Sequence, residues 1–191
     1  MNITTFITDR IKNELIESRI NWKVALVFMP AAFFTFLFHE FGHWIVGEVL
    51  GNDMVISLNN STSFSGQYIH KSHNLYISMG GPAFTILQAA IFLVLIKLTK
   101  SIYAYPFVFF AAFSRFFSVV FGGYSMQDEA KITSILDIGP YTVAIIVVLV
   151  LFALVWRSNY LLKLSFKGVG YYITLSTLSI LLVIGVSKLI P

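Results

Sequence analysis

Five apolar stretches, each near or above the length that a helix needs to cross a bilayer, dominate this chain of 191 residues. About 20 helical residues span the hydrocarbon core of a membrane. Only 12% of the residues are charged, against about 25% in soluble globular domains. We therefore predict one all-α integral membrane domain over residues 1–191, with about five transmembrane helices near residues 24–50, 75–96, 104–123, 139–156 and 168–190.

The segment before the first apolar stretch, residues 1–23, is too polar to cross a bilayer. Its apolar residues nevertheless recur at helical spacing, and the opposite face is charged. This pattern is typical of a helix that lies in the membrane interface. We expect an N-terminal interfacial helix built on Ile3, Phe6, Ile7, Ile11 and Leu15.

Between the first two apolar stretches, residues 51–74 are rich in Asn, Ser, Thr and Gly. Two short alternating pieces, MVISLN and SFSGQYIH, flank residues 59–62, and such alternation indicates strands joined by a turn. We therefore expect a small β-hairpin-like loop after the first span. Its edge can hold an extended peptide by main-chain hydrogen bonds, while a plain hydrophilic loop is the alternative.

His39, Glu40 and His43 lie inside the first apolar stretch. Helical residues four apart share a face, so both imidazoles can bind one metal ion with Glu40 beside it, as in zinc hydrolases. Ionisable groups are costly in hydrocarbon, and their presence favours a functional site. The alternative is a buried hydrogen-bonded cluster of the three side chains.

A third ligand is needed, because a catalytic zinc takes three protein ligands and keeps a fourth position open. The chain has no cysteine, which leaves histidines and carboxylates as the ligand pool. The end of the third span brings Asp128, Glu129 and Asp137 to the same side of the membrane as His39 and His43. Asp128 is the first choice, followed by Glu129 and then Asp137, while capping of the next helical turn is the alternative for the first two.

Three further ionisable groups need an explanation. Arg115 lies in the middle of the third apolar stretch, so it should face the bundle interior and find a counter-charge there. It could steady Glu40 or a substrate carbonyl, or form a structural ion pair. His70 and His73 end the polar segment and are either additional metal ligands or ordinary surface histidines.

The basic residues indicate how the chain is oriented. If there are five spans, nine of them share one side of the membrane and only Lys71, Lys131 and Lys188 lie on the other. By the positive-inside rule we expect a cytoplasmic N-terminus and a plasma (inner) membrane location. The nine are Arg10, Lys12, Arg19, Lys23, Lys97, Lys100, Arg157, Lys163 and Lys167.

The motif HEFGH (39–43) inside a span, the polar hairpin-like stretch after it and then GGP (80–82) opening the next span resemble the site-2 protease family of intramembrane zinc metallopeptidases. The resemblance covers roughly residues 24–137. It implies a helical membrane fold with a zinc-dependent protease site.

By this resemblance His39 and His43 would bind zinc, and Glu40 would activate water. The third ligand of the family is an aspartate from a later span, in a motif with Asn and Pro followed by Leu-Asp-Gly. Here LDIG (136–139) has one extra residue and lacks the Asn-Pro portion. We therefore expect Asp128 to be the third ligand of a divergent member of the family.

Together these features predict a zinc metalloendopeptidase that hydrolyses peptide bonds of membrane-embedded substrates, with a membrane protein or peptide as substrate and the lipid bilayer as surroundings. One alternative is a metal-binding membrane protein that holds substrates or partners without turnover. Another is a small transporter subunit whose polar residues line a path. Nothing resembles a basic patch with interleaved aromatics, which excludes a nucleic-acid partner.

Overall fold

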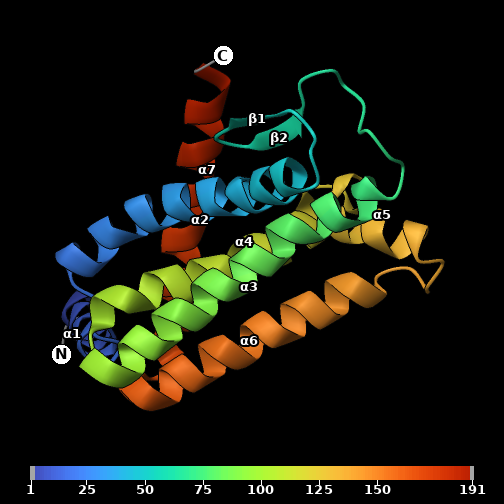
Figure 1. The fold of residues 1–191 in the computed structure, drawn as a ribbon. Helices are drawn as coiled ribbons and strands as arrows, with labels where there is room; N and C mark the ends of the chain where they lie inside the picture. Colours follow the sequence, from blue (N-terminus) through green and yellow to red (C-terminus); the bar gives the residue numbers. More distant parts are fainter. Residues whose placement is uncertain (1–2, 190–191) are drawn as a thin grey trace.

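The computed structural model describes residues 3–189 and is almost entirely helical (Figure 1). Residues 1–2 of the predicted interfacial segment and residue 190 of the predicted fifth span lie outside the described residues, as does residue 191. The elements are α1 (Ile3–Glu17), α2 (Trp22–Val49), β1 (Met54–Ser57), β2 (Asn60–Ser63), α3 (His73–Thr99), η1 (Ile102–Ala104), α4 (Tyr105–Phe121), η2 (Tyr124–Met126), α5 (Asp128–Ile135), α6 (Thr142–Leu162), η3 (Phe166–Gly168) and α7 (Val169–Leu189).

Within residues 3–189, five helices are long and apolar enough to cross a membrane, as the sequence predicts. They are α2, α3, α4 with its leading 3-10 turn, α6 and α7. Their bounds differ from the prediction by a few residues, most at the fourth span, which the sequence predicts near 139–156 and which is Thr142–Leu162. Because α3 begins at His73, Gly80, Gly81 and Pro82 lie inside this helix and do not open it.

The helices α2 and α3 pack closely because glycines face each other at their crossing. A methyl group at Gly42 would overlap the backbone carbonyl of Gly80, and one at Gly80 would overlap that of Gly42. Close backbone approach through small residues is a common way to join helices in membranes. The contact holds the half of α2 that carries the histidines against the first half of α3.

Aromatic side chains fill the core on the other half of the bundle. Phe28 of α2, Tyr105 and Phe110 of α4 and Tyr172 of α7 are almost fully buried. The rings of Tyr105 and Tyr172 lie 4.9 Å apart in an edge-to-face arrangement, which is the favoured geometry for aromatic pairs. This cluster ties α7 to the bundle at one end.

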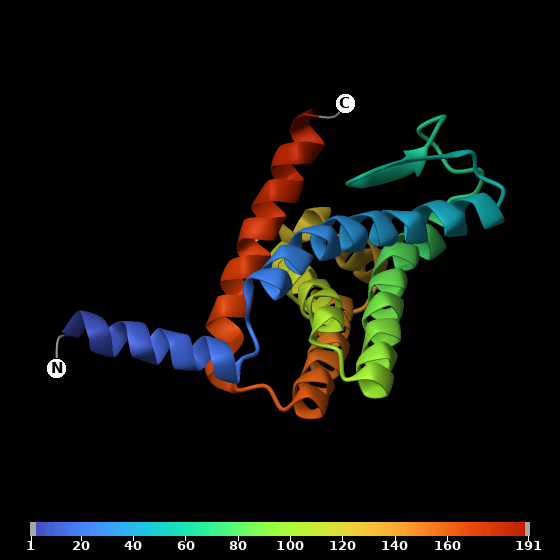
Figure 2. The same cartoon turned by 90° about the vertical axis from the view of Figure 1, so that its left-hand side faces the viewer.

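The predicted N-terminal helix is present as α1, which extends sideways from the bundle (Figure 2). The Tyr172 hydroxyl donates a hydrogen bond to the backbone carbonyl of Ser18 over 2.6 Å. Tyr171 donates to the carboxylate of Glu14 over 3.2 Å. The start of α7 therefore positions the end of α1.

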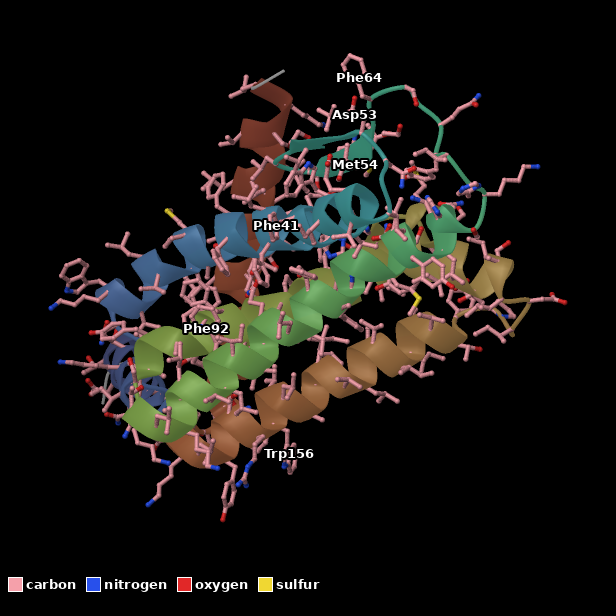
Figure 3. All side chains as sticks on the ribbon, in the orientation of Figure 1. Phe41, Asp53, Met54, Phe64, Phe92 and Trp156 are labelled. Atoms are coloured by element: carbon pink, nitrogen blue, oxygen red, sulfur yellow. The ribbon has the colours of Figure 1, made fainter. Side chains whose placement is uncertain are left out.

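The predicted hairpin is present as an antiparallel pair, in which Met54 lies opposite Ser63. Its turn is shorter than predicted, since β2 already begins at Asn60 and pairs there with Ser57. The hairpin is anchored to α2 because the Glu48 carboxylate accepts a hydrogen bond from the Met54 amide over 2.9 Å. Figure 3 shows Met54 near the end of α2 and Phe64 at the outer side of the loop.

The short helix α5 is an element that the sequence did not predict. It follows η2 directly and has Asp128 and Glu129 in its first turn. Figure 1 shows it beside the beginning of α3, which is also where the second half of α2 lies. This arrangement brings residues some 85 positions apart in sequence to one place.

Candidate metal centre

His39 and His43 lie one turn apart on the face of α2 that is turned toward α3. Both are buried, with 8% and 6% of their surface exposed. Their ring centroids are 4.9 Å apart and their Nε2 atoms 3.2 Å apart. Gly81 of α3 makes room for the rings, because a methyl group there would overlap both of them.

The outer ring nitrogens of both histidines are held by α3. His43 Nδ1 lies 2.6 Å from the carbonyl oxygen of Ile77, which can only accept, so Nδ1 carries the proton. His39 Nδ1 lies 2.9 Å from Thr85 Oγ1. The Thr85 hydroxyl donates to the carbonyl of Gly81 over 3.1 Å, so it accepts the proton of His39 Nδ1. Both Nε2 atoms are then unprotonated and present lone pairs, the state in which imidazole binds metals.

Asp128 completes a nearly equilateral triangle of ligand atoms. Its Oδ2 lies 3.1 Å from His39 Nε2 and 3.2 Å from His43 Nε2. Tetrahedral coordination at about 2.0–2.1 Å separates ligand atoms by about 3.3 Å. The three side chains therefore form a group that could hold a metal ion.

The chemistry of this donor set also fits a cation. Three acceptor atoms point at one another at close range, which is unfavourable unless a positive charge lies between them. Burial opposes ionisation of Asp128, whereas hydrogen bonds donated by protonated histidine rings would hold the pKa of this carboxyl well below its usual range. A cation between the three atoms takes the place of those protons and keeps Asp128 a carboxylate, as a metal ligand has to be.

Glu40 is buried beside the two histidines and lines the same cavity of about 560 Å³. Within the described residues its carboxylate makes no hydrogen bond, so it is free to accept one from a molecule in the cavity. The cavity also contacts the hairpin turn at Asn59 and Asn60. Tyr68, in the loop after the hairpin, contributes to its wall. Burial, and then the negative charge of Asp128, raise the pKa of Tyr68, so its hydroxyl stays a donor.

Arg115 of α4 forms a buried ion pair with Glu129. A structural ion pair is one of the roles that the sequence predicts for this arginine. Its Nε donates to Glu129 Oε1 over 3.0 Å, and Nη2 donates to Oε2. The remaining nitrogen, Nη1, lies 3.4 Å from His39 Nε2. The pair therefore fixes a guanidinium at the edge of the candidate metal centre, and Glu129 is committed to it and not to the metal.

The other candidates of the sequence lie elsewhere. Asp137 is exposed in the loop after α5, with a backbone φ of 51°, and does not line the cavity. His73 contacts the side chain of Asn52 over 3.1 Å and His70 is exposed, so neither lies at the centre. Glu48 anchors the hairpin.

Sequence reasoning missed three contributors to the site: Thr85, the Ile77 carbonyl and Tyr68. The only available signal for Thr85 was its spacing of four from Gly81, which puts both on one face of α3. Comparisons with protein-family models, curated proteins and solved structures give no match to this chain. Its function is therefore argued from its own residues.

Proposed function

We propose that this protein is an intramembrane zinc metalloendopeptidase, in keeping with the resemblance of its sequence to site-2 proteases. The observation that carries the proposal is the convergence of two unprotonated imidazole nitrogens and one carboxylate oxygen within 3.2 Å, with Glu40 free beside them in a cavity. Zinc is the metal that such a His2Asp set with an open position suits best.

The metal ligands and Glu40 have different roles in the proposed hydrolysis. When bound by His39, His43 and Asp128, zinc would polarise a peptide carbonyl and ease deprotonation of water. Glu40 takes a proton from the attacking water as a new carbon–oxygen bond forms at the carbonyl carbon. The carbon–nitrogen bond then breaks, and Glu40 returns the proton to the leaving amine nitrogen.

Two donors are suited to the negative charge that develops on the carbonyl oxygen. The guanidinium of Arg115 is held rigidly by Glu129, so it needs no reorganisation during the reaction. The Tyr68 hydroxyl lies in the wall of the same cavity. Fixed donors of this kind lower the barrier because they are already oriented toward the transition state.

The substrate would be a membrane-embedded segment that has locally lost its helical structure. A helix uses its own carbonyls for internal hydrogen bonds, so it must unwind before a peptide bond can be attacked. The cavity touches the turn of the hairpin, whose strands have unpaired edges. An extended segment could pair with such an edge next to Glu40.

We also propose that the N-terminus is cytoplasmic, because the loops with most of the basic residues end on the side of α1. The hairpin and the candidate metal centre would then face the outer half of the membrane. An export-dependent reporter fused after Asn60 should be active outside, and one fused after Lys163 should not. The reverse pattern would overturn this orientation.

The experiment for the proposed activity compares the wild type with Glu40→Gln and with Asp137→Asn as a matched control. Each is reconstituted with zinc and a reporter helix carrying a Gly-Pro break. We expect cleavage by the wild type and the control, and a loss of about 100-fold or more with Glu40→Gln at unchanged zinc content. Cleavage that persists in Glu40→Gln would refute the proposed role of Glu40.

A metal-binding protein without turnover is the second candidate. It is favoured by the divergence of the third motif, because LDIG (136–139) has one extra residue and lacks the Asn-Pro portion. Zinc in the wild type together with no cleavage of any reporter helix would support this candidate over the protease.

A further inference from the structure

A second cavity of about 590 Å³ lies between α4, α6 and α7, and its chemistry differs from that of the metal centre. Its walls are apolar and mostly aromatic, with Phe113 and Phe116 from α4, Phe152 and Trp156 from α6, and Ile173 from α7. The helices α6 and α7 run apart from the η3 connection (Figure 1). Residues of α4, α6 and α7 and Phe166 of η3 line the cavity. We call this cavity the α6–α7 groove.

One end of the groove contains a buried amide whose oxygen has no partner. Asn159 of α6 lines it, is only 8% exposed, and its Oδ1 makes no hydrogen bond. Leaving a buried amide oxygen unpaired costs free energy, so such a group points to a missing ligand. The side chain of Asn159 also forms a hydrogen bond with Tyr105. Rotation of the amide would let its oxygen accept from the Tyr105 hydroxyl and present its NH2 group to an acceptor in the groove.

The same end of the groove is rimmed by positive charge and by aromatic rings. Lys163 follows Asn159 by one helical turn, and Lys167 lies in η3 next to Phe166. The segment from 157 to 167 contains three basic residues and no acidic one. The rings of Trp156 and Phe166 lie 5.5 Å apart between centroids at an interplanar angle of 46°. Figure 3 shows Trp156 on the half of α6 toward α1. Tryptophan and lysine are typical of the headgroup level of a membrane.

The length of the groove fits a lipid chain. The lining residues of α4 run from Phe109 to Phe121, which corresponds to a length of about 18 Å at 1.5 Å per residue. One leaflet of hydrocarbon is about 15 Å thick, so an acyl chain fits this length.

We propose that the α6–α7 groove binds one anionic phospholipid of the leaflet on the side of α1. An acyl chain lies along the phenylalanines of α4, an ester oxygen accepts a hydrogen bond from Asn159, and the phosphate pairs with Lys163 and Lys167. Anionic lipid is preferred because Lys163 and Lys167 outnumber the nearby carboxylate of Glu14, which is already paired with Arg10. The groove shares Phe117 of α4 with the cavity of the metal centre, but none of the candidate metal ligands lines it.

Trp156 offers a direct readout, because brominated acyl chains quench a tryptophan that they contact. The chain has three tryptophans, and Trp22→Phe with Trp44→Phe leaves Trp156 as the only one. This protein is reconstituted into phosphatidylcholine vesicles with increasing brominated phosphatidylglycerol, and separately with brominated phosphatidylcholine. We expect an about tenfold preference for phosphatidylglycerol over phosphatidylcholine at Trp156.

Two paired variants localise the effect. Lys163→Gln with Lys167→Gln should abolish the preference. The matched control, Lys97→Gln with Lys100→Gln, should retain the preference for phosphatidylglycerol. These lysines lie on the same side of the membrane in the five-span topology, and Lys100, like Lys163, ends a helix with a φ of 55°. Both variants change only exposed side chains, so the fold is kept.

Three results would overturn the proposal. Equal quenching of Trp156 by both lipids, in the protein that keeps Lys163 and Lys167, would show that the groove does not select anionic lipid. An equal loss of preference in the control variant would attribute the effect to the general charge of this side. Protection of Trp156 from both brominated lipids would show that protein, such as a second copy of the chain, covers the groove.

Discussion

Replacement of Thr85 by valine tests whether the second layer of the site controls metal affinity. Valine keeps the shape of threonine but removes the hydroxyl that accepts the proton of His39 Nδ1 over 2.9 Å. The Nδ1–H group would then be buried without a partner, or the proton would move to Nε2 and block the metal position. Either outcome costs about 1–3 kcal/mol. At about 1.4 kcal/mol per tenfold change, zinc affinity should fall about 5- to 150-fold.

The assay is competition for zinc with a chelator of known affinity, in detergent and at constant pH. Thr133→Val is the matched control: Thr133 is equally buried and also donates to the carbonyl four residues earlier, but it does not contact a histidine. The control should stay within about threefold of the wild type, since it keeps both histidine contacts. Unchanged affinity in Thr85→Val, or equal losses in both variants, would refute the reasoning.

Three further variants probe the site and the helix packing around it. Arg115→Met should lower the free energy of unfolding by about 3–5 kcal/mol, because Glu129 would be left as an unpaired buried charge. The double variant Arg115→Met/Glu129→Met should recover most of this stability, as measured by thermal unfolding. Gly42→Ala should lower the melting temperature because its methyl group meets the backbone of α3, whereas Gly170→Ala, with open space around it, should not. Tyr68→Phe should reduce the cleavage rate about tenfold or more at unchanged zinc content, and equal rates would remove Tyr68 from the mechanism.

The helical spans were predictable from the sequence because apolar length is a strong and local signal. The pair His39 and His43 was predictable for a similar reason, since spacing by four on a helix fixes a shared face. Asp128 is preferred over Asp137 because it follows the double glycine at the end of the third span more closely. Of these two aspartates, the structure places only Asp128 next to the histidines. Asp137 lies closer to the family motif, yet the loop after α5 turns it outward.

Other parts of the site could not have been predicted from the sequence. The helix α5 has only eight residues and no apolar period of its own, so its existence depends on packing against α3. The carbonyl of Ile77 has no side-chain signal at all, because any residue could supply it. The tie of Glu129 to Arg115 depends on how α4 and α5 meet, which local spacing does not encode.

The central claim is that His39, His43 and Asp128 hold a zinc ion, and metal content tests it most directly. Elemental analysis of the purified protein should find about one zinc per chain in the wild type and in Asp137→Ala. His43→Ala and Asp128→Ala should each lose it. A wild type without zinc even after loading, or zinc retained in Asp128→Ala and lost in Asp137→Ala, would contradict the claim.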